Sequence, residues 1–94
     1  MHITIRFPDS SGPVGKLADA ELHFTEGLLA GLKLVGFGIW ERGDHVRRVT
    51  LPARQYSING ERRSFSLLRP ATDRASTESL RQAVLDAYDR ELER

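Results

Sequence analysis

Positive charge and aromatic rings are concentrated in one short part of this chain, between Leu51 and Pro70. That segment holds four arginines and only one acidic residue, Glu61, together with two aromatic residues and an Asn-Gly pair. Guanidinium groups bind phosphate oxygens through charge-assisted hydrogen bonds, and aromatic rings stack on unpaired bases. The combination is typical of surfaces that bind single-stranded nucleic acid.

Six arginines are the candidate nucleic-acid-binding residues: Arg47, Arg48, Arg54, Arg62, Arg63 and Arg69. They lie within residues 42–74, which contain eight arginines and three acidic residues and have a net charge of +5. The flanking segments 1–41 and 75–94 each have a net charge of −2, so the whole chain is nearly neutral at +1. A basic centre between acidic ends favours a polyanionic partner, DNA or RNA. The alternative is a basic face that is simply solvated.

No other set of side chains has the spacing of a catalytic or metal-binding site. The three histidines, His2, His23 and His45, are far apart in the sequence, and there is no cysteine for a disulfide or a thiolate metal site. No serine lies in a Gly-x-Ser-x-Gly motif, and the glycines match no phosphate-binding loop. We therefore expect a protein that is not an enzyme and that uses no metal or cofactor.

The length and the hydropathy pattern limit the classes of protein to which the chain can belong. A chain of 94 residues predicts a single domain, residues 1–94, with a modest core. No apolar run approaches the ~20 residues needed to cross a bilayer. The N-terminus lacks the basic and apolar regions of a signal peptide, and no basic amphipathic helix accompanies the positive charge. These features predict a soluble, cytoplasmic protein with no membrane partner.

Alternation of apolar and polar residues predicts the strands that position the arginines. Strands are expected over residues 2–7, 16–24, 32–41 and 46–52, with a loop over 8–15. Both faces of the 32–41 segment are apolar, which indicates a central strand. Its glycines would let large side chains lie close to the backbone. Trp40, near the end of this strand, is either an exposed stacking surface or buried against a helix.

The Asn59-Gly60 pair predicts a β-hairpin, because a type I′ turn needs two residues with positive φ. If Ile58 pairs with Glu61, one face of the hairpin carries Arg54, Tyr56, Ile58, Arg63 and Phe65. The other face then carries Gln55, Ser57, Arg62, Ser64 and Ser66. The first face places arginines beside aromatic rings, and the second is small and polar, which suits solvent or a phosphate backbone. In an alternative interpretation, the two rings belong to the core and the arginine stems lie over them.

The C-terminal segment has a helical repeat over about residues 76–93. Its apolar stripe consists mainly of Leu80, Val84, Ala87 and Tyr88. Ser76 or Thr77 is expected to cap the first turn. The predicted fold is therefore α+β: an antiparallel meander of four or five strands with a C-terminal helix packed on one face. Because one face and at least one edge of such a sheet stay uncovered, we expect a homodimer.

Several short motifs also occur in a recognisable order between about Lys16 and Leu92. Pro52-Ala53-Arg54 follows an apolar strand, and Gly60-Glu61, Arg63 and Pro70 come next. The helix then has a core of Ala83, Val84, Leu85 and Tyr88. This order resembles the stage V sporulation protein G (SpoVG) family of small bacterial regulators. The chain departs from the family pattern in the segment 46–49, "VRRV", where the family is apolar, and it lacks the acidic tail of many members.

The resemblance implies a dimer of antiparallel sheets with C-terminal helices that binds DNA or RNA and influences gene expression or septation. Arg54 and Arg63 match the family's basic positions, whereas the other four arginines are candidates on charge alone. We therefore predict a small, dimeric, nucleic-acid-binding regulator. The alternative prediction is a dimeric protein-interaction module whose basic hairpin binds an acidic partner.

Overall fold

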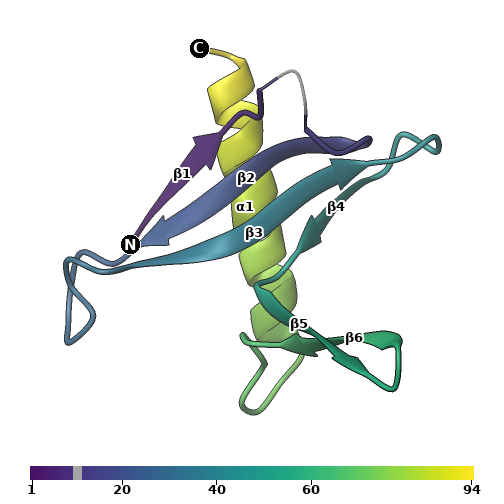
Figure 1. Cartoon of the computed structure of the whole chain (residues 1–94). Coiled ribbons are helices and arrows are strands. Elements are labelled where there is room, and N and C mark those ends of the chain that lie inside the picture. Colours follow the sequence, from purple (N-terminus) through teal and green to yellow (C-terminus); the bar gives the residue numbers. More distant parts are fainter. Residues whose placement is uncertain (10–11) are drawn as a thin grey trace.

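The computed structural model describes residues 1–9 and 12–94, and Figure 1 shows how its elements are arranged. An antiparallel sheet contains, in spatial order, β1 (His2–Arg6), β2 (Lys16–His23), β3 (Lys33–Glu41) and β4 (Arg47–Thr50). A second sheet pairs β5 (Ala53–Ile58) with β6 (Glu61–Ser66), and the helix α1 (Ala75–Leu92) follows. The predicted α+β fold is confirmed. Within the predicted loop 8–15, Ser10 and Ser11 lie outside the described residues.

The large sheet stops at four strands because the chain leaves it at Pro52. Proline has no backbone N–H to extend the ladder with β3. Pro52 packs on Gly36, where an added Cβ would lie 3.3 Å from the proline Cβ. Gly36 has a φ of 106° and lies at an irregularity in the pairing of β3 with β2. The chain therefore turns away from the four-stranded sheet, and β5 and β6 form a hairpin of their own.

The core lies between α1 and one face of the four-stranded sheet. Its buried cluster consists of Ala18, Ala20, Leu22, Phe37, Ile39, Val49, Val84 and Tyr88. The three β2 residues in this cluster alternate along the strand, as the period-two pattern predicted. Val84 and Tyr88 are buried, which confirms the predicted apolar stripe of the helix. In Figure 1 the helix crosses behind β2 and β3. We call the other side of this sheet the open face.

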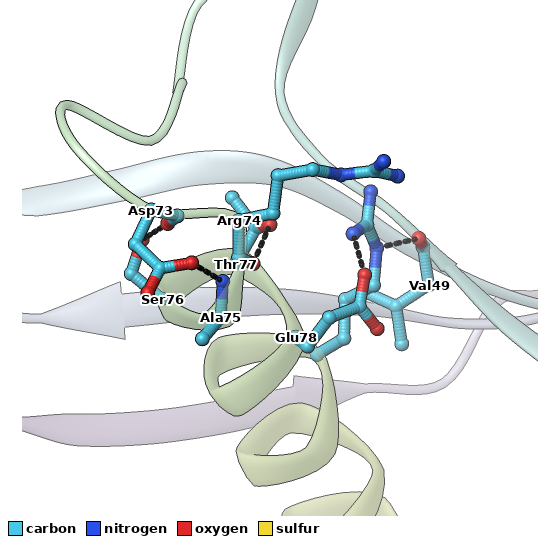
Figure 2. A network of polar contacts seen from close by, with 8 residues as sticks. Val49, Asp73, Arg74, Ala75, Ser76, Thr77 and Glu78 are labelled. Carbon is cyan, nitrogen blue, oxygen red and sulfur yellow. Dashed lines mark hydrogen bonds and ion pairs between the residues drawn. The ribbon is translucent and has the colours of Figure 1, made fainter.

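The first turn of α1 is capped differently from the prediction. The helix begins at Ala75, with Arg74 at the N-cap and no side-chain cap hydrogen bond. The Asp73 carboxylate accepts a hydrogen bond of 3.0 Å from the Ala75 amide. The hydroxyls of Ser76 and Thr77 instead donate to backbone carbonyls, each at 2.8 Å (Figure 2). The predicted hydroxyl cap was wrong because both residues lie inside the helix, past the position from which a cap acts.

The same end of the helix is attached to the edge strand β4. Arg81 donates from Nε to the Val49 carbonyl at 3.3 Å and from a terminal nitrogen to the Glu78 carboxylate at 2.9 Å. Val49 and Glu78 appear on either side of this contact in Figure 2. Arg81 therefore links the first turns of α1 to β4, just before the chain enters the hairpin.

Candidate nucleic-acid interface

The hairpin has the turn and the register that the sequence predicted. Asn59 and Gly60 have φ angles of 52° and 83°, as a type I′ turn requires. Ile58 pairs with Glu61, Tyr56 with Arg63, and the register continues to Ala53 and Ser66. The two predicted faces of the hairpin are therefore present, because side chains alternate across paired strands.

The aromatic side chains of the hairpin are exposed and do not belong to the core. Tyr56 is 39% exposed and Phe65 is 48% exposed, and the buried cluster includes neither of them. The guanidinium carbon of Arg69 lies 4.1 Å from the centre of the Phe65 ring, and Arg69 Nε donates to the Ser66 carbonyl at 3.1 Å. The interpretation that placed both rings in the core is therefore wrong for this chain. We call this surface the aromatic–arginine face, made of Arg54, Tyr56, Arg63, Phe65 and Arg69.

Two of the six candidate arginines lie away from the hairpin and are already paired. Arg47 forms a 2.6 Å ion pair with Asp89 of α1, and its guanidinium carbon lies 5.1 Å from the centre of the Tyr88 ring. Arg48 forms a 2.6 Å ion pair with Asp44 in the turn before β4. These contacts hold β4 against the helix and close the turn. The structure thus does not bring all six arginines onto one surface.

The Arg48–Asp44 pair is well matched electrostatically. The hydrogen bond from the Arg48 guanidinium, with a second from the Val46 amide, holds the pKa of the Asp44 carboxyl below its usual range. The hydrogen bond to the Asp44 carboxylate in turn raises the pKa of Arg48. Both groups are therefore charged at neutral pH, and Arg48 has less positive charge to offer an external phosphate than an unpaired arginine has.

The other four candidate arginines belong to the hairpin and its exit. Among the described residues, Arg54 and Arg62 have neither an ion pair nor a side-chain hydrogen bond. Arg63 pairs with Glu61 at 3.0 Å, but both side chains are more than half exposed, and such surface pairs contribute little. Arg62 projects from the small polar face, opposite Arg54 and Arg63. The hairpin therefore presents positive charge on both of its faces.

Trp40 lies on the open face of the sheet and not against the helix. Its strand neighbour Ile39 is fully buried in the core, so the alternation of β3 turns Trp40 to the opposite side. The indole Nε1 donates to Thr50 Oγ1 at 3.0 Å. The sequence could not predict this placement. Alternation along β3 puts Trp40 and Ile39 on opposite faces, but both faces are apolar in sequence, so the pattern did not show which face packs on the helix.

A groove lies between the open face and the hairpin, and the sequence did not predict it. Its volume is about 600 Å³, and its lining includes Trp40 and Thr50 from the sheet and Gln55, Ser64 and Ser66 from the hairpin. Three residues far apart in sequence, Lys16, Trp40 and Gln55, meet in this groove. Lys16 and Trp40 are paired across β2 and β3, and the turn at Pro52 brings Gln55 of the hairpin to them.

A second charged cluster on the open face has a structural role. Glu21 is 9% exposed and accepts contacts from Arg6 at 3.0 Å, His23 at 3.2 Å and Lys33 at 3.4 Å. The hydrogen bond from Arg6 holds the pKa of the Glu21 carboxyl below its usual range, although burial acts in the opposite direction. These residues come from β1, β2 and β3, so the cluster joins three strands.

Among the described residues, no group of three or more histidine and acidic side chains is placed to hold a metal ion. No helix in the described part of the chain is long and apolar enough to span a membrane. The fold is α+β, with an exposed basic hairpin. Comparisons with protein-family models, with curated proteins and with solved structures found no match.

Proposed function

We propose that this chain is a small, non-enzymatic, nucleic-acid-binding regulatory protein of the bacterial cytoplasm, as the SpoVG resemblance implies. The observation that best supports the proposal is the aromatic–arginine face of the hairpin. Tyr56 and Phe65 lie beside Arg54, Arg63 and Arg69, and both rings are exposed when the described residues are considered. Rings that stack on bases and cations that follow the phosphate backbone are the two components of single-strand binding.

Positive charge on both faces of the hairpin is available to an external anion. Arg54 and Arg62 have no partner among the described residues, and the only acid in the hairpin strands is Glu61. Each arginine that contacts a phosphate releases condensed counterions, so the affinity should fall steeply as the salt concentration rises. The proposed contacts depend on backbone charge and stacking, so they favour broad binding over recognition of one sequence.

We further propose that the protein acts as a homodimer. A two-stranded hairpin is only marginally stable in water unless it packs against something else, and all of its strand residues except Ser66 are exposed. β4 pairs only with Gly38–Glu41 of β3, so the other half of β3 has a partner on one side only. Light scattering at micromolar concentration should give twice the monomer mass, and a monomer mass would contradict this part of the proposal.

An acidic protein partner is the second candidate function, supported by a different feature of the hairpin. Ile58 is 48% exposed and Leu67, just after β6, is 60% exposed. Neither side chain can stack on a base, but both could pack in a protein interface surrounded by arginines. These two exposed apolar side chains, one at each end of the hairpin, are the feature that favours a protein partner.

The two functions differ in how binding responds to nucleic acid and salt. Labelled single-stranded DNA, duplex DNA and RNA should each be titrated with the full chain at two salt concentrations. We expect binding of at least one single-stranded probe, with an affinity that falls steeply at the higher salt concentration. Absence of binding to all three probes at the lower salt concentration would contradict the first function and favour the protein partner.

A further inference from the structure

The groove between the open face and the hairpin has the size and lining of a small-ligand site. Its volume of about 600 Å³ falls within the roughly 300–1,000 Å³ typical of such sites. The sheet contributes Trp40 and Thr50, and the hairpin contributes the short polar side chains of Gln55 and Ser64. A flat aromatic surface opposite hydrogen-bonding groups suits a planar, polar ligand.

The indole of Trp40 is held in position before any ligand binds. Its Nε1 is hydrogen-bonded to Thr50 Oγ1 at 3.0 Å. The ring lies close to the backbone of Gly38, where an added Cβ would be only 2.6 Å from the indole nitrogen and 2.9 Å from the threonine hydroxyl. Gly38 therefore makes room for the indole on the sheet. A surface that is ordered in advance loses little conformational freedom when a ligand binds.

Two positive side chains lie near the Trp40 ring. Lys16 Nζ lies 5.6 Å from the centre of the Trp40 ring, and the Arg42 guanidinium carbon lies 5.9 Å from it. Lys16 also pairs with Asp19 at 2.6 Å, so Arg42 is the less compensated of the two. Lys16 and its partner Asp19 both line the groove. The groove thus combines an aromatic surface with one ion pair in its lining and Arg42 near the ring.

The polar groups on the hairpin side can exchange partners. Gln55 Nε2 donates to Ser64 Oγ at 3.3 Å, and both side chains are exposed. A glutamine amide has donors and an acceptor, and a serine hydroxyl is both donor and acceptor. Because the bond that joins them is long and exposed, it can be replaced by bonds to the edge of a base at little cost.

We propose that this groove binds one unpaired base of a single-stranded nucleic acid, with the base stacked on Trp40 and its edge facing Gln55 and Ser64. The proposal rests on the nucleic-acid-binding function proposed above and adds a site distinct from the aromatic–arginine face. Bases in a duplex are stacked and paired, so their faces cannot reach Trp40. The groove therefore gives the protein a preference for single strands over duplexes, which phosphate contacts alone do not provide.

Trp40 is the only tryptophan of the chain, so its fluorescence reports on this groove alone. The full chain should be titrated with oligothymidylate and with a duplex of the same length at one salt concentration. We expect the single strand to quench Trp40 emission and to protect it from acrylamide. The duplex should leave both properties unchanged. This test uses the parent protein, so its result does not depend on whether a variant folds.

Substitutions then measure the contribution of the ring. Trp40→Leu should weaken binding of labelled oligothymidylate by at least about fivefold, the lower end of what stacking on one base contributes. Trp40→Phe, which keeps an aromatic surface, should recover part of the loss. The salt dependence should be the same in both variants, because neither changes a charge. Thermal melting of each variant should be recorded to show that it is folded.

The possible outcomes separate this proposal from the function on which it rests. If the parent binds oligothymidylate with no change in Trp40 emission or acrylamide quenching, the groove is not the base site, although the protein is a nucleic-acid binder. Equal affinity of the parent and a folded Trp40→Leu variant would overturn the proposal in the same way. If the parent binds no nucleic acid at all, both the groove site and the proposed function are wrong.

Discussion

The four-stranded sheet and its helix differ from the β5–β6 hairpin in where they place apolar and charged side chains. In the sheet and helix, apolar side chains are buried together, and the one buried acid, Glu21, has three partners. In the hairpin, aromatic and apolar side chains face solvent, and Arg54 and Arg62 have no partner among the described residues. Two phenylalanines show the contrast, because Phe37 is fully buried and Phe65 is 48% exposed.

Under the proposed function, the sheet and helix stabilise the fold and the hairpin binds the partner. A small domain has a total stability of only about 5–15 kcal/mol, so exposed aromatic residues that contribute little to it need another explanation. Arginines follow the same division. Arg47 and Arg81 are joined to helix or strand partners, whereas Arg54 and Arg62 of the hairpin have no partner among the described residues.

The largest expected effect is on the helix side of the core. Val84→Asp places a carboxylate at a position with no exposure and no partner in the core, and an isolated buried charge costs several kcal/mol. We expect the variant to be largely unfolded at room temperature by circular dichroism. Ser79→Asp, on an exposed position of the same helix, is the matched control and should melt like the parent. Unchanged melting of the Val84 variant would show that α1 does not cover the sheet.

The two phenylalanines test the comparison directly. Phe37→Ala should lower the free energy of unfolding by about 3–5 kcal/mol, as truncation of a buried ring does. Phe65→Ala should lower it by less than about 1 kcal/mol, because its ring is half exposed. For nucleic-acid binding we expect the opposite order, with Phe65→Ala weakening single-strand binding by about 1–3 kcal/mol through loss of one stacked base. Urea denaturation and oligonucleotide titration measure the two effects. Equal destabilisation by both substitutions would remove the distinction between the regions.

A smaller effect should appear at low pH in the Glu21 cluster. The pKa of Glu21 is lower in the folded protein than in an unfolded chain, so the unfolded state binds the proton more readily. The stabilisation from this carboxylate is therefore present at neutral pH and is lost as the pH falls through the folded-state pKa. Glu21→Gln should melt below the parent at pH 7, and the difference should shrink below about pH 4.

The control for this prediction is Glu26→Gln. Glu26 is exposed and lies in the loop between β2 and β3. Its substitution should leave the pH dependence of melting as it is in the parent. A constant difference between the Glu21→Gln variant and the parent across the same pH range would mean that Glu21 does not supply this acid sensitivity.

Local signals in the sequence were sufficient to predict much of this structure. Asn59-Gly60 predicted the turn and the full hairpin register, and the helical repeat predicted burial of Val84 and Tyr88. These features depend on residues that are close together in the chain. The predicted N-cap was wrong because the helix begins at Ala75, so Ser76 and Thr77 lie inside it and their hydroxyls donate to backbone carbonyls.

The arrangement of the candidate site could not be predicted in the same way. Whether an arginine is paired depends on contacts between distant residues, as between Arg47 and Asp89. The groove depends on the direction in which the chain leaves Pro52, which is set by the close packing of that proline on Gly36. The linear charge pattern identified six candidate arginines, and the fold divides them between β4 and the hairpin with its exit.

The central claim is that the hairpin arginines without partners in the chain contact phosphates. It predicts that Arg54→Gln and Arg62→Gln change the salt dependence of single-strand binding, whereas Arg90→Gln does not. Arg90 lies in the last turn of α1 and is exposed. Arg90→Gln is therefore the control, because it removes the same charge from the protein at a site far from the hairpin in sequence.

The most direct measurement is the slope of log K against log salt concentration for oligothymidylate binding by the parent and these three variants. Each lost phosphate contact should flatten the slope by about 0.7, and the melting temperature should change little, since surface substitutions usually move stability by about ±0.5 kcal/mol. The account predicts flatter slopes for Arg54→Gln and Arg62→Gln and the parent slope for Arg90→Gln. Parent-like slopes in all three folded variants would contradict it.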